Sequence, residues 1–350
     1  MSAIPKGIDA AALEAWFPRN VAGTQAPLHF ELIAGGHSNL TFSVEDAAGR
    51  KFALRRPPLG FKPQHGAHDV GREYRIIAAL KNATVPVPLA EAMCKDDGVI
   101  GAPFYVMRWV DGRILDRASQ VEAMLPTADD RRQASFNLID TLAALHACDV
   151  DQVGLGDLGA RENYLERQLT RLRQVWEKTK TRELPIIESL HEQLLAQRPP
   201  QRYTGLVHSD FRFGNLMLDE SGGVAAVLDW ELCALGDVLV DVGFLMTNWD
   251  QPGDAWPDVW MQPPPTRAGG FPSRDELLAR YAEKTGYDLR SIEYYCAFCY
   301  WRIAIIAEGI KRRYQSGAMS SQHTDLDAVE RRVRDRAAMA RRYLDLAAAT

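Results

Sequence analysis

The chain has 350 residues, of which 41 are Lys or Arg and 46 are Asp or Glu, and its formal net charge is −5 at pH 7. This balance gives no basic footprint and disfavours a nucleic-acid partner. No run approaches the roughly 20 apolar residues of a membrane span, and the N-terminus lacks the basic-then-apolar pattern of a signal peptide. We therefore expect a cytoplasmic protein with neither a nucleic-acid nor a membrane partner.

The N-terminal part of the chain has one short amphipathic stretch followed by alternating apolar runs. These patterns predict one helix and then three strands, at residues 12–20, 29–33, 40–44 and 51–56. Gly35 and Gly36 lie in the turn between the first two strands, and Ser38 follows them. Backbone N–H groups of a glycine turn can approach a phosphate because no Cβ interferes, and a serine hydroxyl adds a donor. Gly35, Gly36 and Ser38 are therefore candidate phosphate-binding residues.

The middle of the chain changes from mixed to helical patterning. A helix that carries Glu73 is predicted at residues 69–80, and a strongly apolar strand at 104–110. Beyond residue 128 the apolar spacing becomes helical, which predicts helices at 132–148, 162–178 and 184–198. His146 near the end of the first of these helices is expected to be a structural residue rather than a ligand.

The segment 206–237 concentrates the polar residues that suggest chemistry. Apolar runs at 206–207 and 224–228 predict a hairpin-like pair of strands, with His208, Asp210 and Asn215 on the loop between them and Asp229 just after the second run. Taken singly, each residue has a commoner role in a turn or a helix cap. Together they can supply a carboxylate that orients an acceptor hydroxyl and oxygen ligands for Mg²⁺, as phosphoryl transfer requires.

The sequence H-x-D-x-x-x-x-N, followed by an Asp after an apolar strand, resembles the catalytic and metal-binding segments of the aminoglycoside phosphotransferase and choline kinase group of protein-kinase-like enzymes. The second element is Leu-Asp-Trp-Glu rather than Asp-Phe-Gly, a departure that is usual in the small-molecule branch. The resemblance implies ATP and Mg²⁺ as cofactors, with Asp210 as the base or orienting group beside His208. Asn215 and Asp229 are the implied metal ligands, and Arg212 is expected to help neutralise the transferred charge.

The same resemblance implies roles for residues of the nucleotide-binding part. In the kinase pattern V-A-x-K the Ala faces adenine and the Lys reaches the phosphates. Ala53 and Arg55 have this relationship, so Arg stands where the wider group has Lys, and Glu73 is expected to hold it. A solvated Arg55 beside Arg56 is the alternative. The strand at 104–110 would be the hinge between lobes, with contacts to adenine expected at Met107, Arg108 and Val110.

The implied fold is α+β and bilobal, like that of protein kinases. A small N-terminal nucleotide-binding lobe of antiparallel strands plus one helix is expected over residues 1–111. A larger, mainly helical C-terminal lobe that carries the catalytic and acceptor-binding residues is expected over 112–350. The sequence G-D-x-x-x-D that ends at Asp241 resembles the start of a family helix, and Asp241 is expected to bond the backbone of the catalytic loop. A basic helix at 328–342 is expected to present a solvated face.

Within this group, the segments GGHSNLTF, LRRPP, HSDFRFGN and LDWELCALGD are most similar to the kinase-like region fused to certain long acyl-CoA dehydrogenases and to its free-standing bacterial relatives. This likeness implies a hydroxyacyl-CoA acceptor such as 4-hydroxyacyl-CoA. An aminoglycoside or a choline-like alcohol is the alternative acceptor. Phe213 departs from the branch, which usually has Pro there. A kinase fold is expected to fill the 350 residues without room for a dehydrogenase domain.

A catalytically silent kinase fold that binds a nucleotide or an acyl-CoA is the alternative function, and only Arg55 in place of Lys supports it. The protein is expected to be a monomer or a homodimer. The five scattered cysteines indicate reduced thiols rather than disulfides. Cys296 and Cys299 form C-x-x-C within an aromatic stretch, where they are expected on the buried face of a helix rather than in a metal site.

Overall fold

The structure is a computed structural model that describes residues 4–34, 39–60, 69–254, 263–316 and 325–349. Gly35, Gly36 and Ser38 lie outside the described residues, so their phosphate contacts stay predictions. No helix among the described residues is long and apolar enough to cross a membrane.

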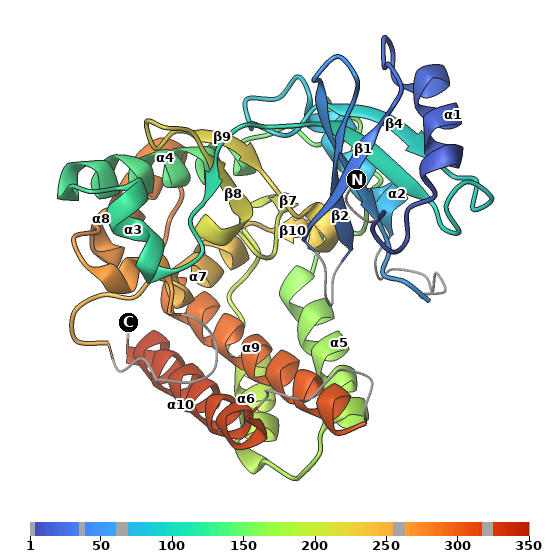
Figure 1. The fold of residues 1–350 in the computed structure, drawn as a ribbon. Helices are drawn as coiled ribbons and strands as arrows, with labels where there is room; N and C mark the ends of the chain where they lie inside the picture. The colour runs from blue at the N-terminus through green and yellow to red at the C-terminus, as the bar shows by residue number, and fades with distance from the viewer. Residues whose placement is uncertain (1–3, 35–38, 61–68, 255–262, 317–324, 350) are drawn as a thin grey trace.

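The N-terminal part is an antiparallel sheet with one helix on each side (Figure 1). Its strand order is β1-β2-β3-β5-β4, and the strands are β1 His29–Ala34, β2 Leu40–Glu45, β3 Lys51–Arg56, β4 Ala90–Cys94 and β5 Phe104–Arg108. The two helices are α1 Ala10–Asn20 and α2 Val70–Leu80. Each begins at an aspartate, Asp9 or Asp69, whose side chain accepts a backbone N–H from the first helical turn.

Alternation along β5 divides the core of this lobe between two faces of the sheet. Phe104 and Val106 point toward α1 and pack with Phe17, whereas Tyr105 and Met107 belong to the core shared with α2 and the C-terminal lobe. These four side chains of β5 are buried. The α2 face of the sheet is therefore the one that meets the rest of the molecule.

The C-terminal part is mainly helical, as predicted. Its helices are α3 Val121–Met124, α4 Ala128–His146, α5 Tyr164–Thr179, α6 Pro185–Ala196, α7 Leu239–Thr247, α8 Arg274–Thr285, α9 Ile292–Gln315 and α10 Leu326–Ala349. Two small sheets lie among them, one made of β6 Arg113–Ile114, β8 Leu216–Leu218 and β9 Val224–Val227, and one made of β7 Thr204–Val207 and β10 Ala234–Asp237. The α+β bilobal fold is thus confirmed, whereas the boundary at residues 111 and 112 stays a prediction.

Helix α9 is the central element of the helical part, and α5, α6, α7 and α10 pack around it (Figure 1). Its aromatic segment is buried, and Cys296 and Cys299 lie there as free thiols, as expected. Burial raises the pKa of both thiols, which keeps them protonated and poorly suited to bind metal.

The structure corrects two sequence predictions and adds one strand. The predicted pairing of residues 206–207 with 224–228 is wrong, because β7 pairs with β10 and β9 pairs with β8. A turn closed by Asp219, whose Oδ1 accepts the N–H groups of Ser221 and Gly223 at 2.8 Å, joins β8 directly to β9. Strand β4 was not predicted. Helix α10 is longer than predicted and not simply solvated, because one face, including Val333 and Ala337, is buried against α9.

Candidate active site

The loop that carries His208, Asp210 and Asn215, here called the catalytic loop, is anchored by one buried carboxylate at the start of α7. Asp241 has no exposed area, and its Oδ1 and Oδ2 accept the backbone N–H groups of Ser209 and His208 at 2.7 and 2.6 Å. His146 Nε2 lies 3.3 Å from the same carboxylate, and His146 Nδ1 lies 2.6 Å from the hydroxyl of Tyr281. The predicted contact of Asp241 with the loop and the structural role of His146 are both confirmed. Ser209 adopts φ +74°, a left-handed conformation that this anchoring stabilises.

His208 was predicted beside Asp210 as a catalytic residue, and its surroundings argue for a different role. The ring has no exposed area, its Nε2 lies 2.9 Å from the carbonyl oxygen of Leu228, and its Nδ1 accepts the backbone N–H of Asp210 at 3.3 Å. A fully buried ring with both nitrogens engaged has no path to a substrate. His208 is therefore a positioning residue that ties the catalytic loop to the strand before Asp229.

Asp210 and Asn215 lie side by side on the loop. The amide Nδ2 of Asn215 donates to the carbonyl oxygen and to Oδ2 of Asp210, at 2.8 and 2.7 Å. Arg212 Nε lies 3.3 Å from Oδ1 of Asp210. With its nitrogen committed to Asp210, Asn215 keeps its amide oxygen as the atom that can bind a cation. Asp210 remains 25 % exposed, so its carboxylate is accessible to a substrate.

Arg55 connects the two lobes through two carboxylates. Its Nε donates to Glu73 Oε2 at 2.9 Å, as predicted, and its Nη2 donates to Asp229 Oδ1 at 2.5 Å, which was not predicted. The Arg55 side chain is only 12 % exposed, so the alternative of a solvated residue is wrong. Burial acts to lower the pKa of Arg55, but the carboxylates of Glu73 and Asp229 help to raise it above its ordinary value.

Glu73 is buried beneath this cation. Burial raises its pKa to about 7, although the Arg55 guanidinium acts in the opposite direction. Asn39, which the sequence did not single out, donates a further hydrogen bond from Nδ2 to Glu73 Oε2 at 3.3 Å. Glu73 thus holds Arg55 from the N-terminal lobe while Asp229 contacts it from the C-terminal lobe.

A cavity of about 410 Å³ lies between the lobes at this point. Predicted site residues from both lobes line it: Arg55, Glu73, Met107, Arg108, Val110, Asn215 and Asp229. The Arg108 side chain turns outward and its Nη2 donates to Glu91 at 2.8 Å, so a hinge contact from this residue would use main-chain atoms. Apolar side chains from both lobes, such as Ala53 and Met217, also line this cavity.

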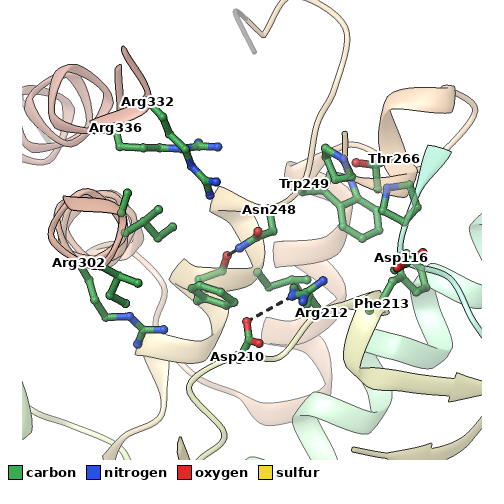
Figure 2. Close-up of a pocket in the computed structure, with 18 of the residues that line it drawn as sticks. Asp116, Asp210, Arg212, Phe213, Asn248, Trp249, Thr266, Arg302, Arg332 and Arg336 are labelled. Atoms are coloured by element: carbon green, nitrogen blue, oxygen red, sulfur yellow. Dashed lines mark hydrogen bonds and ion pairs between the residues drawn. The ribbon is translucent and has the colours of Figure 1, made fainter. Parts of the chain in front are cut away.

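A second cavity of about 340 Å³ opens on the other side of the catalytic loop (Figure 2). Asp210, Arg212 and Phe213 line it together with residues of α7, α9 and α10. Gly214 lines both cavities. Nothing in the sequence motifs pointed to the walls of this cavity, because they come from segments far apart along the chain.

The donor set of the first cavity fits Mg²⁺. Asn215 offers an amide oxygen, and Asp229 offers a carboxylate that is 27 % exposed. Among the described residues no three or more His, Cys, Asp or Glu side chains form a metal-binding cluster. Mg²⁺ needs no such cluster, because it commonly takes one or two protein ligands and completes its shell with water and phosphate oxygens.

Comparison with known proteins assigns the chain to a family. The model of the family described as "Phosphotransferase enzyme family" matches residues 29–294. The chain belongs to this family. A solved structure of an aminoglycoside-phosphotransferase-like protein from Ralstonia eutropha is 34% identical, with a TM-score of 0.80 over 96% of this chain and 98% of that one. The ADP-bound aminoglycoside phosphotransferase APH(2'')-Ib is 15% identical and shares the fold, with a TM-score of 0.59 over 95% of this chain and 99% of that one.

The predicted likeness to kinase-like regions fused to acyl-CoA dehydrogenases is also confirmed. This phosphotransferase is 32% identical to acyl-CoA dehydrogenase family member 10 of Mus musculus over 316 residues, which are 89% of this chain and 29% of the relative. Acyl-CoA dehydrogenase family member 11 of Homo sapiens is 29% identical over 328 residues, 91% of this chain and 41% of the relative. The chain therefore spans less than half the length of these curated relatives.

Proposed function

We propose that this phosphotransferase transfers the terminal phosphoryl group of ATP, with Mg²⁺, to a hydroxyl of a small-molecule acceptor. The observation that carries the proposal is the position of the catalytic loop between the two cavities. Asn215 and Asp229 line the cavity between the lobes, Asp210 lines the other, and Gly214 lines both. A nucleotide in the first cavity and a hydroxyl in the second would meet at Asp210.

The residues of the loop divide the work of such a transfer. Asp210 would accept the hydrogen bond and then the proton of the acceptor hydroxyl, since its carboxylate is accessible and oriented by Asn215. Arg55 would bind the phosphates, and Arg212 would offset charge near the transferred group. Asn215 and Asp229 would hold Mg²⁺, which when bound neutralises charge on the phosphate oxygens.

A hydroxyacyl-CoA thioester is the first acceptor class to test. The proposal is supported by the names of the curated relatives, which are acyl-CoA dehydrogenase family members. Aminoglycosides and choline-like alcohols are the alternatives, because solved structures with this fold include an aminoglycoside phosphotransferase and a choline kinase. The relatives are longer than this chain, so their activities do not transfer to it directly.

The test is a screen for Mg²⁺-dependent ATP consumption across hydroxyacyl-CoA thioesters, choline-like alcohols and aminoglycosides. Transfer is counted only where mass spectrometry finds the phosphorylated acceptor, because ADP formation alone can reflect hydrolysis. We expect a phosphorylated product with at least one hydroxylated acceptor. Binding of ATP without any phosphorylated product across the panel would support the catalytically silent alternative instead.

A further inference from the structure

One buried arginine of α9 lies against the catalytic loop. Arg302 is 7 % exposed, and its Nη2 donates to the carbonyl oxygen of Ser209. Its guanidinium also lies 4.9 Å from the ring centroid of Phe244 on α7. Arg302 and Asp210 line the same cavity, and in Figure 2 the Arg302 side chain extends from α9 toward the loop segment that carries Asp210. Arg302 therefore connects α9 and α7 to the residue that precedes Asp210.

The charge of Arg302 is not neutralised by a carboxylate of the described part of the chain. None of the Asp and Glu side chains there forms an ion pair with it, and its buried Nε has no hydrogen-bond partner there. A buried cation without a carboxylate costs free energy, and an apolar side chain of similar volume often avoids that cost. The carbonyl of Ser209 and the ring of Phe244 offset part of it through a charge-assisted hydrogen bond and a cation–π contact. Packing alone therefore does not account for an arginine at this position.

The contact of Arg302 falls on the peptide group that precedes Asp210. The carbonyl of Ser209 and the N–H of Asp210 belong to one planar group. The N–H donates to His208 Nδ1 at 3.3 Å, which is long for a hydrogen bond, whereas the carbonyl accepts a charge-assisted bond from Arg302. The plane also contains the Cα of Asp210. Arg302 is therefore the stronger of the two contacts that fix where the Asp210 side chain begins.

The residue between these contacts has a backbone conformation that needs support. Ser209 adopts φ +74°, and a residue other than glycine keeps such a conformation only where its surroundings hold it. The Ser209 N–H donates to Asp241 Oδ1 at 2.7 Å, and its carbonyl accepts from Arg302. Asp241 on α7 thus holds one side of Ser209, and Arg302 on α9 holds the other.

We propose that Arg302 is a positioning residue for phosphoryl transfer. It holds the carbonyl of Ser209, fixes the peptide group before Asp210, and so aims the Asp210 carboxylate at the acceptor hydroxyl. This inference rests on the proposed phosphotransferase function and adds to it a residue that lies far outside the sequence motifs. Because Arg302 acts through Ser209, its removal should slow the transfer and leave nucleotide binding intact.

Arg302→Met tests this role, because methionine has a similar length and lacks the charge. Product formation is measured with each acceptor of the panel above that the parent phosphorylates. We expect kcat to fall by roughly 10- to 100-fold, since a reacting group displaced by about 1 Å can cost on the order of 100-fold in rate. ATP affinity from calorimetry should stay at the parent value, because the described lining of the cavity between the lobes does not include Arg302.

Hydrogen exchange measures the hold on the loop without any turnover. In the absence of ligands, the backbone amides of residues 206–218 should exchange faster in Arg302→Met than in the parent. Circular dichroism at the assay temperature should show that the variant is folded. The faster exchange then reports a local change in the catalytic loop rather than global unfolding.

Three controls separate positioning from packing. Arg302→Lys should keep part of the rate, because the charge returns without the planar fork. In Arg302→Ala, guanidinium ion at low millimolar concentration should restore part of the rate, whereas it should restore none in Asp210→Asn. Arg313→Met removes an exposed arginine of the same helix and should match the parent in rate and in exchange.

The outcomes for Arg302 and for the proposed function are distinct. The inference is overturned if Arg302→Met keeps the parent kcat and exchange, or if only the KM for the acceptor rises. It is also overturned if the rate falls only in step with the folded fraction and guanidinium restores none of it. A parent that phosphorylates no acceptor of the panel would instead contradict the proposed function, and exchange in the loop would still show whether Arg302 holds it.

Discussion

Arg55 performs a task that a lysine could not perform in the same way. Its planar guanidinium reaches Glu73 with Nε and Asp229 with Nη2, so one side chain contacts carboxylates of both lobes. A lysine ammonium is a single point of charge and lacks this fork geometry. Arg in place of the kinase Lys therefore adds a second contact, to Asp229. This contact orients the Asp229 carboxylate before a nucleotide binds.

Removing the Arg55 charge should weaken both nucleotide binding and rate. We expect Arg55→Met to lower turnover by about 100-fold, because a buried cation aimed at phosphate stabilises the transferring group. Arg55→Lys should keep part of each property. ATP affinity from calorimetry and turnover from product formation test this, and parent-like values in Arg55→Met would contradict it.

A double-mutant cycle tests the pairing of Arg55 with Glu73. The losses of ATP-binding free energy in Arg55→Met and in Glu73→Gln should not sum to the loss in the double variant, because the two side chains contact each other. Strictly additive losses would mean that the contact has no energetic weight.

The stability of the protein should depend on pH through Glu73. Burial raises its pKa from an ordinary 4.5 to about 7, so the folded state binds more protons than the unfolded state between these values. The free energy of unfolding should therefore fall as pH rises from about 4.5 to about 7. Glu73 should account for a fall on the order of 3 kcal/mol, and the curve should then level off.

Glu73→Gln isolates this contribution, since it cannot titrate. Thermal unfolding of the parent and the variant is measured at a series of pH values without nucleotide or Mg²⁺. The difference between their free energies of unfolding should change between about pH 4.5 and pH 7. Asp237, whose pKa burial raises to about 6, titrates in both chains and cancels. A difference that is constant with pH would contradict the assignment.

Asp229 has a backbone conformation that limits how it can be tested. Its φ of +64° is left-handed, a region that Asn and Asp tolerate better than Ala. Asp229→Asn is thus the cleaner variant, because it removes the carboxylate charge and keeps the backbone preference. We expect both Asp229→Asn and Asp229→Ala to abolish Mg²⁺-dependent turnover, and Asp229→Ala to lose more stability than Asp229→Asn, because both lose the charge contact with Arg55 but only Ala also disfavours the left-handed backbone. Parent-like turnover in Asp229→Asn would remove Asp229 from the metal site.

At the scale of elements, the crossing of α7 over α9 supports the catalytic loop. Gly243 lies in α7 two residues after Asp241, and a Cβ there would come within 2.7 Å of the backbone carbonyl carbon of Tyr295 on α9. Any side chain must push the helices apart, which would move the carboxylate that fixes the loop.

Gly243→Ala should therefore destabilise the fold by roughly 1–3 kcal/mol and reduce turnover. Gly309→Ala on α9 is the matched control, because its Cβ would meet Thr179 at an ordinary 3.8 Å. That change should stabilise the protein by up to about 1 kcal/mol, since alanine favours a helix more than glycine. Urea unfolding of both variants measures these effects, and equal shifts in the same direction would contradict the close approach.

The elements differ in how well the sequence predicted them. The first three strands and the main helices follow from periodicity and from end signals such as Asp69 before α2. Strand pairing was predicted less well, because the partner of β7 is β10, which follows beyond the whole catalytic segment. Local patterns carry no information about such a partner.

The same limit applies to the site. His208, Asp210, Asn215 and Asp229 form a motif because they lie close in sequence, and Arg55 was found through a strand pattern. Asn39 and the second contact of Arg55 were missed because they depend on how the lobes approach each other. The sequence predicted only a basic, solvated helix at α10, whereas Arg336 of that helix is buried and lies over the ring of Tyr300 on α9.

At the scale of the whole molecule, two cavities meet at one loop. The N-terminal sheet and the C-terminal lobe form the first, and helices α7, α9 and α10 form most of the second. Asp241 anchors the catalytic loop to α7 through hydrogen bonds from the loop backbone. In the proposed function, this arrangement would separate the binding of the two substrates and bring their reacting groups to Asp210.

Replacing Asp210 with Asn tests this account most directly. The change keeps the size of the side chain and removes the carboxylate that would accept the proton. With ATP, Mg²⁺ and an acceptor, the parent should give a phosphorylated product by mass spectrometry. Asp210→Asn should bind ATP with parent-like affinity in calorimetry and form product about 10² to 10⁴ times more slowly. Product formation at the parent rate, or loss of ATP affinity together with the rate, would contradict the account.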